Sequence, residues 1–421
     1  MTTQALSQGI DQLAKARLLL RRCGEMLGLD SGLLDRLSMP DKIVQTHSPV
    51  RMDDGTLRMF AGYRVQHNNI LGPYKGGLSY QPGLDIDHVT AYAMLMTWQC
   101  SLVGLPHGGA KGGVNVDPFT LSLGELERLT RRYTSDMGLI FHPSKDIPSP
   151  NVNTSPREMA WIMDTWSVNH GYSAPGVVTG KPMVIGGTVG RGMATGRGVI
   201  DALDDLLTYQ GRSWQGLRIA LHGFGKLGSA AGALAHRHGA KLVAISDVSG
   251  GLYRADGIDV PDLLAYTKAH HFIKGYEGAD VIPAEEVLYV ACDVLILAST
   301  GLQIQARSSD RIQAETIVEG ANAPITYEAD AVLEKRGVTI LPDILANAGG
   351  AIVSYFEWVQ DTQHLFWSED EVNDRLKTLM SRAFLKVVKN VATQHLSFRM
   401  GAYTEAVGRV AEALTLRGLY P

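Results

Sequence analysis

The stretch LRIALHGFGKLG, residues 217–228, decides the fold class of this 421-residue chain. Its apolar first half has the length of one buried strand, and a glycine-rich turn leads from it into a helix of small residues. A second buried strand, KLVAISD, follows at 241–247. This order of elements is typical of a β-α-β unit. Further short apolar runs predict additional parallel strands, and hence an α/β fold with a doubly wound sheet, at 293–298, 316–318 and 338–341.

The turn matches G-x-G-x-x-G in a context that favours dinucleotide binding. Gly223, Gly225 and Gly228, with Phe224 between them, would let the backbone approach a pyrophosphate at the helix N-terminus. Asp247 follows about 20 residues later, as expected for a carboxylate that accepts a hydrogen bond from a ribose 2′-hydroxyl. The same carboxylate would repel a 2′-phosphate, so NAD is favoured. NADP remains possible if a basic side chain from elsewhere compensates.

Length and composition predict two domains and exclude several classes of partner. A single core seldom extends over 421 residues. The net charge of −4, without a basic stripe, argues against nucleic acid. Three widely separated cysteines have neither metal-ligand nor disulfide spacing, so no metal is expected. No signal peptide and no apolar run of about 18 residues is present, so we expect a cytoplasmic protein that does not enter a membrane.

The first domain is expected to be α/β and to cover residues 1–183, joined by a C-terminal helix at 397–421. The second, nucleotide-binding domain then covers 184–396. Alternation predicts strands at 42–50 and 57–68, with a turn at Gly55 and Thr56. Apolar residues at helical spacing predict helices in four segments, at about 6–37, 87–103, 121–137 and 157–169. Asp87 is the expected N-cap of the second segment.

Two glycine-rich segments carry a lysine each. LPHGGAKGGVNVDP (105–118) sets Lys111 between two pairs of glycine, and GPYKGG (72–77) repeats the arrangement with Lys75. A lysine on such a bare backbone can lose solvation, acquire a lowered pKa and act on carbonyl groups. Each segment alone could equally be an exposed loop, and we expect loops at both, as at the Pro- and Ser-rich 144–156.

Taken in order, these motifs resemble the glutamate/leucine/phenylalanine/valine dehydrogenase family. LPHGGAKGGVNVDP resembles its active-site signature, and the likeness covers nearly the whole chain. The stretches that resemble the glutamate dehydrogenase branch are GYRVQHN (62–68), GPYKGGLSY (72–80), ATGRGV (194–199), IVEGAN (317–322), LANAGGAIVSYFEW (345–358) and RVAEALTLRGLYP (409–421).

The resemblance implies roles for three residues of the substrate site. Lys111 matches the catalytic lysine that polarises the reacting carbon centre, and Lys75 matches the lysine that binds the distal carboxylate of glutamate. Ser354 matches the serine that assists it. A lysine and a hydroxyl at these places favour a dicarboxylate, because an unpaired buried lysine would be costly beside an aliphatic ligand.

The resemblance also implies the cofactor contacts and the assembly. Thr195 resembles the threonine that hydrogen-bonds the nicotinamide carboxamide, and Asn322 and Asn347 resemble asparagines lining the cofactor and substrate cleft. The family forms hexamers, some of them mixed. The implied ligands are NAD or NADP with glutamate and 2-oxoglutarate, or an amino-acid effector.

Two departures from the family fall at the chemical centre. The family's lysine for the α-carboxylate is replaced by Gln99, which keeps a hydrogen bond but loses the stronger charge-assisted contact. The loop that carries the catalytic aspartate reads Asp146-Ile-Pro-Ser-Pro-Asn151. The first acid is retained, but an amide stands at the catalytic position and cannot transfer a proton.

Three hypotheses therefore remain open. The chain is a fully active NAD-dependent glutamate dehydrogenase, or a weakly active regulatory subunit of a glutamate dehydrogenase hexamer that contains an active paralogue, or a dehydrogenase for another amino acid. Lys75 with Ser354 speaks against the third. The two substitutions at the chemical centre lead us to favour the regulatory subunit.

Overall fold

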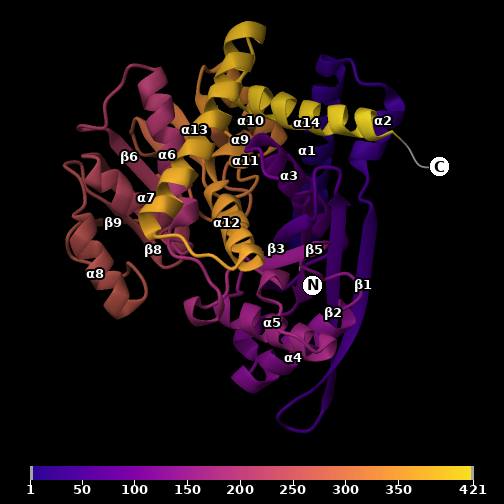
Figure 1. The fold of residues 1–421 in the computed structure, drawn as a ribbon. Coiled ribbons are helices and arrows are strands. Elements are labelled where there is room, and N and C mark those ends of the chain that lie inside the picture. The colour runs from indigo at the N-terminus through magenta and orange to yellow at the C-terminus, as the bar shows by residue number, and fades with distance from the viewer. Residues whose placement is uncertain (1–2, 419–421) are drawn as a thin grey trace. The chain divides into compact units, whose positions relative to one another are not determined.

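The structure is a computed structural model that describes residues 3–418, with side chains from Gln12 onward. The described chain divides into two compact units (Figure 1). Unit 1 contains the residues up to Arg191, Ala351–Asn373 and those from Tyr403, and unit 2 contains Gly192–Gly350 and Asp374–Ala402. The first change of unit lies close to the expected boundary at 183/184. Residues 351–373 belong to unit 1, although the sequence had suggested the second domain.

Unit 1 is built on a five-stranded mixed sheet. The expected hairpin at 42–68 is confirmed, and Gly55 has a φ of 85° in its turn. In the order β1-β2-β4-β3-β5, the first two pairs are antiparallel and the last two are parallel. The strands are β1 (Lys42–Arg51), β2 (Leu57–Asn68), β3 (Tyr74–Gln81), β4 (Gly109–Asn115) and β5 (Asp146–Pro150).

Three segments expected to be loops contain strands, and close packing is the physical reason. The segments 72–77, 105–118 and 144–156 supply β3, β4 and β5. A Cβ atom on Gly76 would overlap the carbonyl oxygen of Ala110 on β4, and one on Gly109 would overlap Thr97. These glycines therefore let backbones pack closely, rather than making turns as their number had suggested.

Helices cover both faces of this sheet. Helix α3 packs on β2 and β4, and α4 packs on β1 and α5. The N-cap of α3 is Asp85, whose carboxylate accepts from His88 N at 2.8 Å, so the expected cap at Asp87 is wrong and that residue lies in the first turn. The helices are α1 (Thr3–Leu27), α2 (Ser31–Ser38), α3 (Ile86–Leu102), α4 (Leu123–Asp136) and α5 (Pro156–His170), with short 3₁₀ turns at Pro118–Thr120, Pro175–Val177 and Met183–Ile185.

Unit 2 contains a seven-stranded sheet of order β12-β11-β10-β6-β7-β8-β9. Its first five members pair in parallel, which confirms the doubly wound α/β fold, and two unexpected antiparallel strands extend one edge. The strands are β6 (Arg218–His222), β7 (Lys241–Asp247), β8 (Gly250–Tyr253), β9 (Asp280–Ile282), β10 (Val294–Leu297), β11 (Thr316–Glu319) and β12 (Thr339–Leu341).

The remaining helices confirm the predicted helical C-terminal region. None of the helices in the described residues is long and apolar enough to cross a membrane. In unit 2 they are α6 (Ala194–Tyr209), α7 (Lys226–Arg237), α8 (Val260–His270), α9 (Ala306–Ser309), α10 (Tyr327–Lys335) and α11 (Asp343–Ala346), with a 3₁₀ segment at Ala284–Tyr289. The last three helices are α12 (Gly349–Gln363), α13 (Glu369–Gln394) and α14 (Phe398–Arg417).

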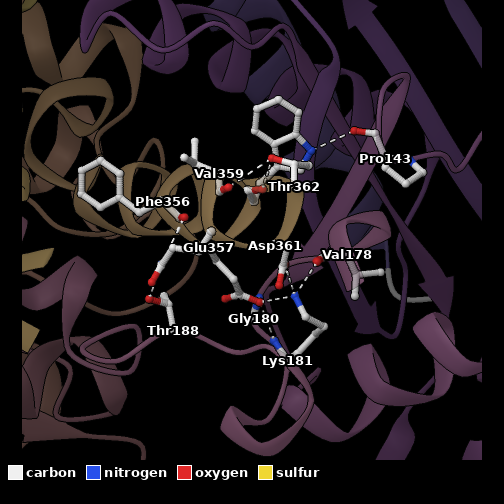
Figure 2. A network of polar contacts seen from close by, with 12 residues as sticks. Pro143, Val178, Gly180, Lys181, Thr188, Phe356, Glu357, Val359, Asp361 and Thr362 are labelled. Atoms are coloured by element: carbon white, nitrogen blue, oxygen red, sulfur yellow. Dashed lines mark hydrogen bonds and ion pairs between the residues drawn. The ribbon is translucent and has the colours of Figure 1, made fainter. Parts of the chain in front are cut away.

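A buried ion-pair network fixes α12 within unit 1 (Figure 2). Lys181 Nζ lies 2.6 Å from Glu357 Oε1 and 2.7 Å from Asp361 Oδ2 on successive turns of α12. It also donates to Val178 O at 3.0 Å. The backbone N–H of Gly180 donates to the Glu357 carboxylate as well, at 2.9 Å. These partners satisfy charges that burial would otherwise make costly.

We expect Lys181→Met to lower the free energy of unfolding by about 3–5 kcal/mol, because two carboxylates would lose their shared buried cation. Lys377 is the matched control, since it also bridges two carboxylates, Asp204 and Asp205, but is 36% exposed. Lys377→Met should cost at most about 1 kcal/mol. Chemical denaturation of both variants measures the difference, and equal losses would contradict the role given to Lys181.

Candidate functional site

Lys75 and Lys111 lie on the same face of the unit 1 sheet. Strands β3 and β4 pair from Leu78 and Gly112 onward, so the preceding residues Gly77 and Lys111 are neighbours. Because side chains alternate along a strand, Lys75 shares the face of Gly77. We call this the lysine face. Helix α3 covers part of it, and the Lys111 Nζ lies 5.3 Å from the centre of the Tyr92 ring.

Both lysines are buried, with 2% and 4% of their surface exposed. Burial lowers the pKa of Lys75 to about 7, and the charge of Arg191 contributes to the shift. Burial and the charge of Arg64 lower the pKa of Lys111 to about 7 as well. The two amines therefore change charge near neutral pH, where a lysine can both hold an anion and exchange a proton.

Arg191 and Ser354 extend the site beside Lys75. The Arg191 Nε donates to the Ser354 Oγ at 3.0 Å, and Ser354 is 1% exposed on α12. The carboxylate of Glu357, one turn further along α12, acts on the charges of both Arg191 and Lys75. The predicted pair of Lys75 and Ser354 thus comes with a guanidinium that the sequence reasoning missed. Its signal was an arginine between Gly190 and Gly192, three residues before the start of ATGRGV.

Gln99 and His107 complete the buried surroundings. Gln99 is 7% exposed on α3. His107 is fully buried, with its ring edge-on to Tyr355 and Trp358 at centroid distances of 5.6 and 5.1 Å. Burial and the Lys75 charge lower the pKa of His107 to about 3, so this imidazole is neutral and adds no charge to the site.

Asn151 lies at an exposed position directly after β5. Its Oδ1 accepts a hydrogen bond from Ser79 Oγ at 3.1 Å. Its backbone N–H donates to Thr154 Oγ1, which in turn donates to Leu78 O, at 2.8 Å each. The segment is therefore held on β3, on the side of the sheet where a Cβ on Gly77 would touch the Asn151 side chain.

Asp146 is not available as a replacement acid on the lysine face. Arg64 pairs with Gly112 and so lies on the opposite face. There its guanidinium forms a fully buried ion pair with Asp146, and Gln66 Nε2 also donates to that carboxylate at 2.8 Å. The retained acid of the sequence motif therefore joins β2 to β5 and has a structural role.

The glycine-rich turn of unit 2 has the form expected of a pyrophosphate cradle. Gly223 follows β6 with a φ of 106°, where a Cβ would meet Ala298 after the neighbouring β10. A Cβ on Gly228 would overlap the Gly223 carbonyl oxygen, so this glycine permits close packing of α7 on the turn. Gly225 caps α7 without a side-chain hydrogen bond and has no atom within 4 Å of a built Cβ, so an anion can approach the helix N-terminus from that side.

Two further predicted cofactor residues, Asp247 and Phe224, lie near the glycine-rich turn in the sequence of unit 2. Asp247 ends β7, and its carboxylate accepts from Ser249 N at 2.7 Å and from Ile273 N at 2.9 Å, so neighbouring backbone orients it. Phe224 is 8% exposed, so its ring belongs to the core and only its backbone could contribute to the turn's contact with a cofactor.

Thr195, expected at the nicotinamide, and the two asparagines expected to line the cofactor and substrate cleft lie on separate segments of unit 2. Thr195 lies in the first turn of α6. Asn322 follows β11 and Asn347 follows α11, and Asn347 Nδ2 donates to Asn322 Oδ1 at 2.7 Å. The structure therefore brings the two asparagines together, as a pair that could present amide groups to a ligand. Among the described residues no group of three or more His, Cys, Asp or Glu side chains is arranged to hold a metal.

Comparisons with known proteins agree with both units. A family model described as Glu/Leu/Phe/Val dehydrogenase, dimerisation domain, matches residues 40–168, and one described as Glutamate/Leucine/Phenylalanine/Valine dehydrogenase matches 186–418. Glutamate dehydrogenase of Thermotoga maritima is 45% identical over 95% of this chain and 96% of its own. Glutamate dehydrogenase B of Halobacterium salinarum is 43% identical, over 97% and 95%.

A solved structure is similarly close. The hetero-hexameric glutamate dehydrogenase from Thermus thermophilus, in a form with leucine bound, has a TM-score of 0.92 and 38% identity to this chain. The likeness covers 96% of both chains. The similarity in fold therefore extends over both units rather than over the dinucleotide-binding sheet alone.

Two glycines of the turn should separate stability from nucleotide binding. Gly228→Ala should lower the free energy of unfolding by about 1–3 kcal/mol, because α7 must move away from the Gly223 carbonyl. Gly225→Ala should change stability by less than about 0.5 kcal/mol but weaken NADH binding at least tenfold, because its Cβ would stand where the pyrophosphate approaches. Thermal denaturation and NADH fluorescence titration measure the two effects. Unchanged NADH affinity in Gly225→Ala would contradict the cradle.

Burial of the charged lysine amines should lower the free energy of unfolding. At pH 6, Lys75→Met should raise the free energy of unfolding by roughly 1–3 kcal/mol, because the charged amine is no longer buried. The pKa is about 7 in the folded chain against an ordinary 10.5, so the unfolded chain binds more protons between these values. The advantage of the variant should therefore decline above pH 7 and vanish above 10.5.

Lys145→Met, at an exposed position of the same unit, is the control and should change stability little at any pH. Denaturation curves from pH 6 to 10.5 provide the measurement. An advantage of Lys75→Met that stays constant over this range would contradict the lowered pKa.

Proposed function

The chain belongs to the Glutamate/Leucine/Phenylalanine/Valine dehydrogenase family, and from this premise we propose that it is a glutamate dehydrogenase of low intrinsic activity that acts as a regulatory subunit. The observation that carries the proposal is the absence, on the described lysine face, of a carboxylic acid able to transfer protons. Asn151 stands at the catalytic position, and Asp146 is paired with Arg64 on the opposite face.

The binding functions of the site are retained. Lys75 and Arg191 supply positive charge for the distal carboxylate of a dicarboxylate, and Ser354 on α12 is oriented by the hydrogen bond that it accepts from Arg191. Lys111, with a pKa near 7, can donate to the oxygen of a 2-oxo group. Gln99 offers only a neutral contact to the α-carboxylate. The site can therefore hold the ligand but lacks the carboxylate that would move the protons of ammonia addition and loss.

The nucleotide site is proposed to take NAD, with NADP as the alternative. The glycine turn with Gly225, together with Asp247, Thr195 and Asn322, would hold the dinucleotide, which supplies the hydride acceptor when bound. Asp247 favours a free ribose hydroxyl over a 2′-phosphate. A regulatory subunit could use this site to sense the nucleotide without turning it over.

We propose a hexameric assembly in the cytoplasm, formed either by this chain alone or together with an active paralogue. The assembly of the Thermus thermophilus relative supports the mixed form, and leucine in that structure supports an amino acid as one possible effector. Co-purification of this chain with a paralogue that keeps the lysine and the aspartate would be the direct sign of a mixed hexamer.

A fully active, NAD-dependent glutamate dehydrogenase remains the second candidate, and one observation favours it. The pKa of Lys111, about 7, is the value at which a general acid or base works best at neutral pH. Lys111 could then transfer protons through a bound water molecule and so take over the role of the missing aspartate. The two candidates differ in turnover, so kinetics separates them.

The purified protein alone should show glutamate-dependent reduction of NAD and NADP close to background. Asn151→Asp combined with Gln99→Lys should raise kcat by about 10²-fold or more, the usual contribution of a positioned acid or base. Asn115→Asp is the control, because it adds the same charge on β4, at a side chain already held by Gly83 N. It should give no gain.

Turnover of the unmodified protein within the usual enzyme range, about 1–10³ s⁻¹, would establish the second candidate instead. A double variant that binds its ligands normally and still does not react would contradict the explanation of the defect. Both outcomes are read from the same assay, with ligand binding measured separately.

A further inference from the structure

The lysine face presents positive charge with which no carboxylate of the described chain forms an ion pair. Glu357, whose charge acts on Lys75 and Arg191, and Asp146 on β5 both have other partners. Glu357 accepts from Gly180 N and from Lys181 Nζ, at 2.9 and 2.6 Å. Asp146 is bound by Arg64 on the opposite face. Lys75, Lys111 and Arg191 therefore form a set of cations whose natural partner is an anion from solution.

Asn151 adds a donor to this set because Ser79 orients its amide. The Ser79 hydroxyl donates to Asn151 Oδ1 at 3.1 Å, so the amide oxygen is turned toward β3. The amide nitrogen is on the other side. A Cβ built on Gly77 would lie 3.2 Å from Asn151 Nδ2, and Gly77 is the residue beside Lys111 on the lysine face. The same Cβ would lie 2.7 Å from Asn151 Cβ, so the Asn151 side chain covers the bare glycine and thereby lies beside Lys111 on the lysine face.

Lys111 and the oriented Asn151 amide favour the ketone oxygen of a 2-oxo acid over the α-ammonium group of an amino acid. A ketone oxygen accepts hydrogen bonds, and both Lys111 Nζ and Asn151 Nδ2 can donate to it. The α-ammonium of an amino acid needs acceptors, but it would meet a donor amide and the like charge of Lys111, whose burial leaves such repulsion poorly screened. The amino acid also carries one negative charge less.

We propose that the lysine face selects a 2-oxo dicarboxylate over the corresponding amino acid, with Ser79 as the residue that positions the Asn151 amide for this choice. The inference rests on the proposed function, because it concerns the same site. The site then acts as a receptor for the keto acid, and its occupancy follows the ratio of keto acid to amino acid rather than the concentration of the amino acid alone.

Equilibrium binding to the intact protein without nucleotide tests the proposal. Isothermal titration calorimetry with 2-oxoglutarate and with L-glutamate should give at least about a tenfold tighter Kd for the keto acid. Asn151→Asp should reduce the ratio of the two affinities by tenfold or more, because the new carboxylate accepts from the ammonium and repels the dianion. Asn115→Asp, which adds the same charge on β4 with its side chain held by Gly83 N, should leave the ratio unchanged.

Ser79→Ala tests the positioning role without adding charge. With its oxygen released, the amide can turn and offer Oδ1 to an ammonium, so affinity for L-glutamate should rise about threefold or more while affinity for 2-oxoglutarate falls. If Ser79 had only a structural role, Ser79→Ala would lower the affinity for both ligands together.

Equal affinity for the two ligands, tighter binding of L-glutamate, or no binding of either would overturn the proposal. None of these results bears on the low activity, which the turnover assay measures without reference to the affinity ratio. Conversely, a high turnover with a tenfold preference for the keto acid would leave the selectivity in place and remove the regulatory function.

Discussion

The burial of two lysine amines without carboxylate partners is the constraint on which the first unit depends. An ammonium group withdrawn from water costs several kcal/mol unless a counter-charge is supplied. Lys75 and Lys111 are nevertheless 2% and 4% exposed, on adjacent strands and on one face. Their burial follows from the glycines around them, because Gly76 and Gly109 let β3, β4 and α3 pack too closely to admit the solvent that a lysine needs. Burial thus lowers the pKa of both amines to about 7, and a bound anion would favour their charged form.

The same unit also contains buried charges that are fully paired, and the contrast is informative. Lys181 has two carboxylates and a carbonyl oxygen within 3.0 Å, and Arg64 has both oxygens of Asp146. These pairs join segments distant in sequence, as structural ion pairs do. Buried charges are thus fully paired at two places in this unit, whereas Lys75 and Lys111 have no carboxylate partner. Such unpaired buried charges are expected of groups that bind a ligand rather than stabilise the fold.

Much of this could be predicted from sequence, and the failures have a common cause. The alternation of buried strands with helices determined the doubly wound sheet, and the paired spacing of Gly223 and Gly228 located its turn. The sequence predicts loops in place of strands β3 and β4 because glycine usually signals a turn, whereas here its missing side chain permits close backbone contact. Arg191 and the partner of Asp146 could not be found, because both depend on contacts between segments far apart in the sequence.

Loss of a proton acceptor and retention of a charged pocket have different consequences for a site. Catalysis of amination needs a group that changes its protonation during the reaction, and an amide at position 151 cannot provide one. Binding of a dicarboxylate needs only fixed donors and cations, and replacing an acid by an amide increases both the donor count and the net positive charge. On the proposed function, the amide that limits turnover also strengthens the site as an anion receptor. For this reason Asn151 is better understood as a change of ligand preference than as the decay of an enzyme, and Ser79, which holds its oxygen, belongs to the same change.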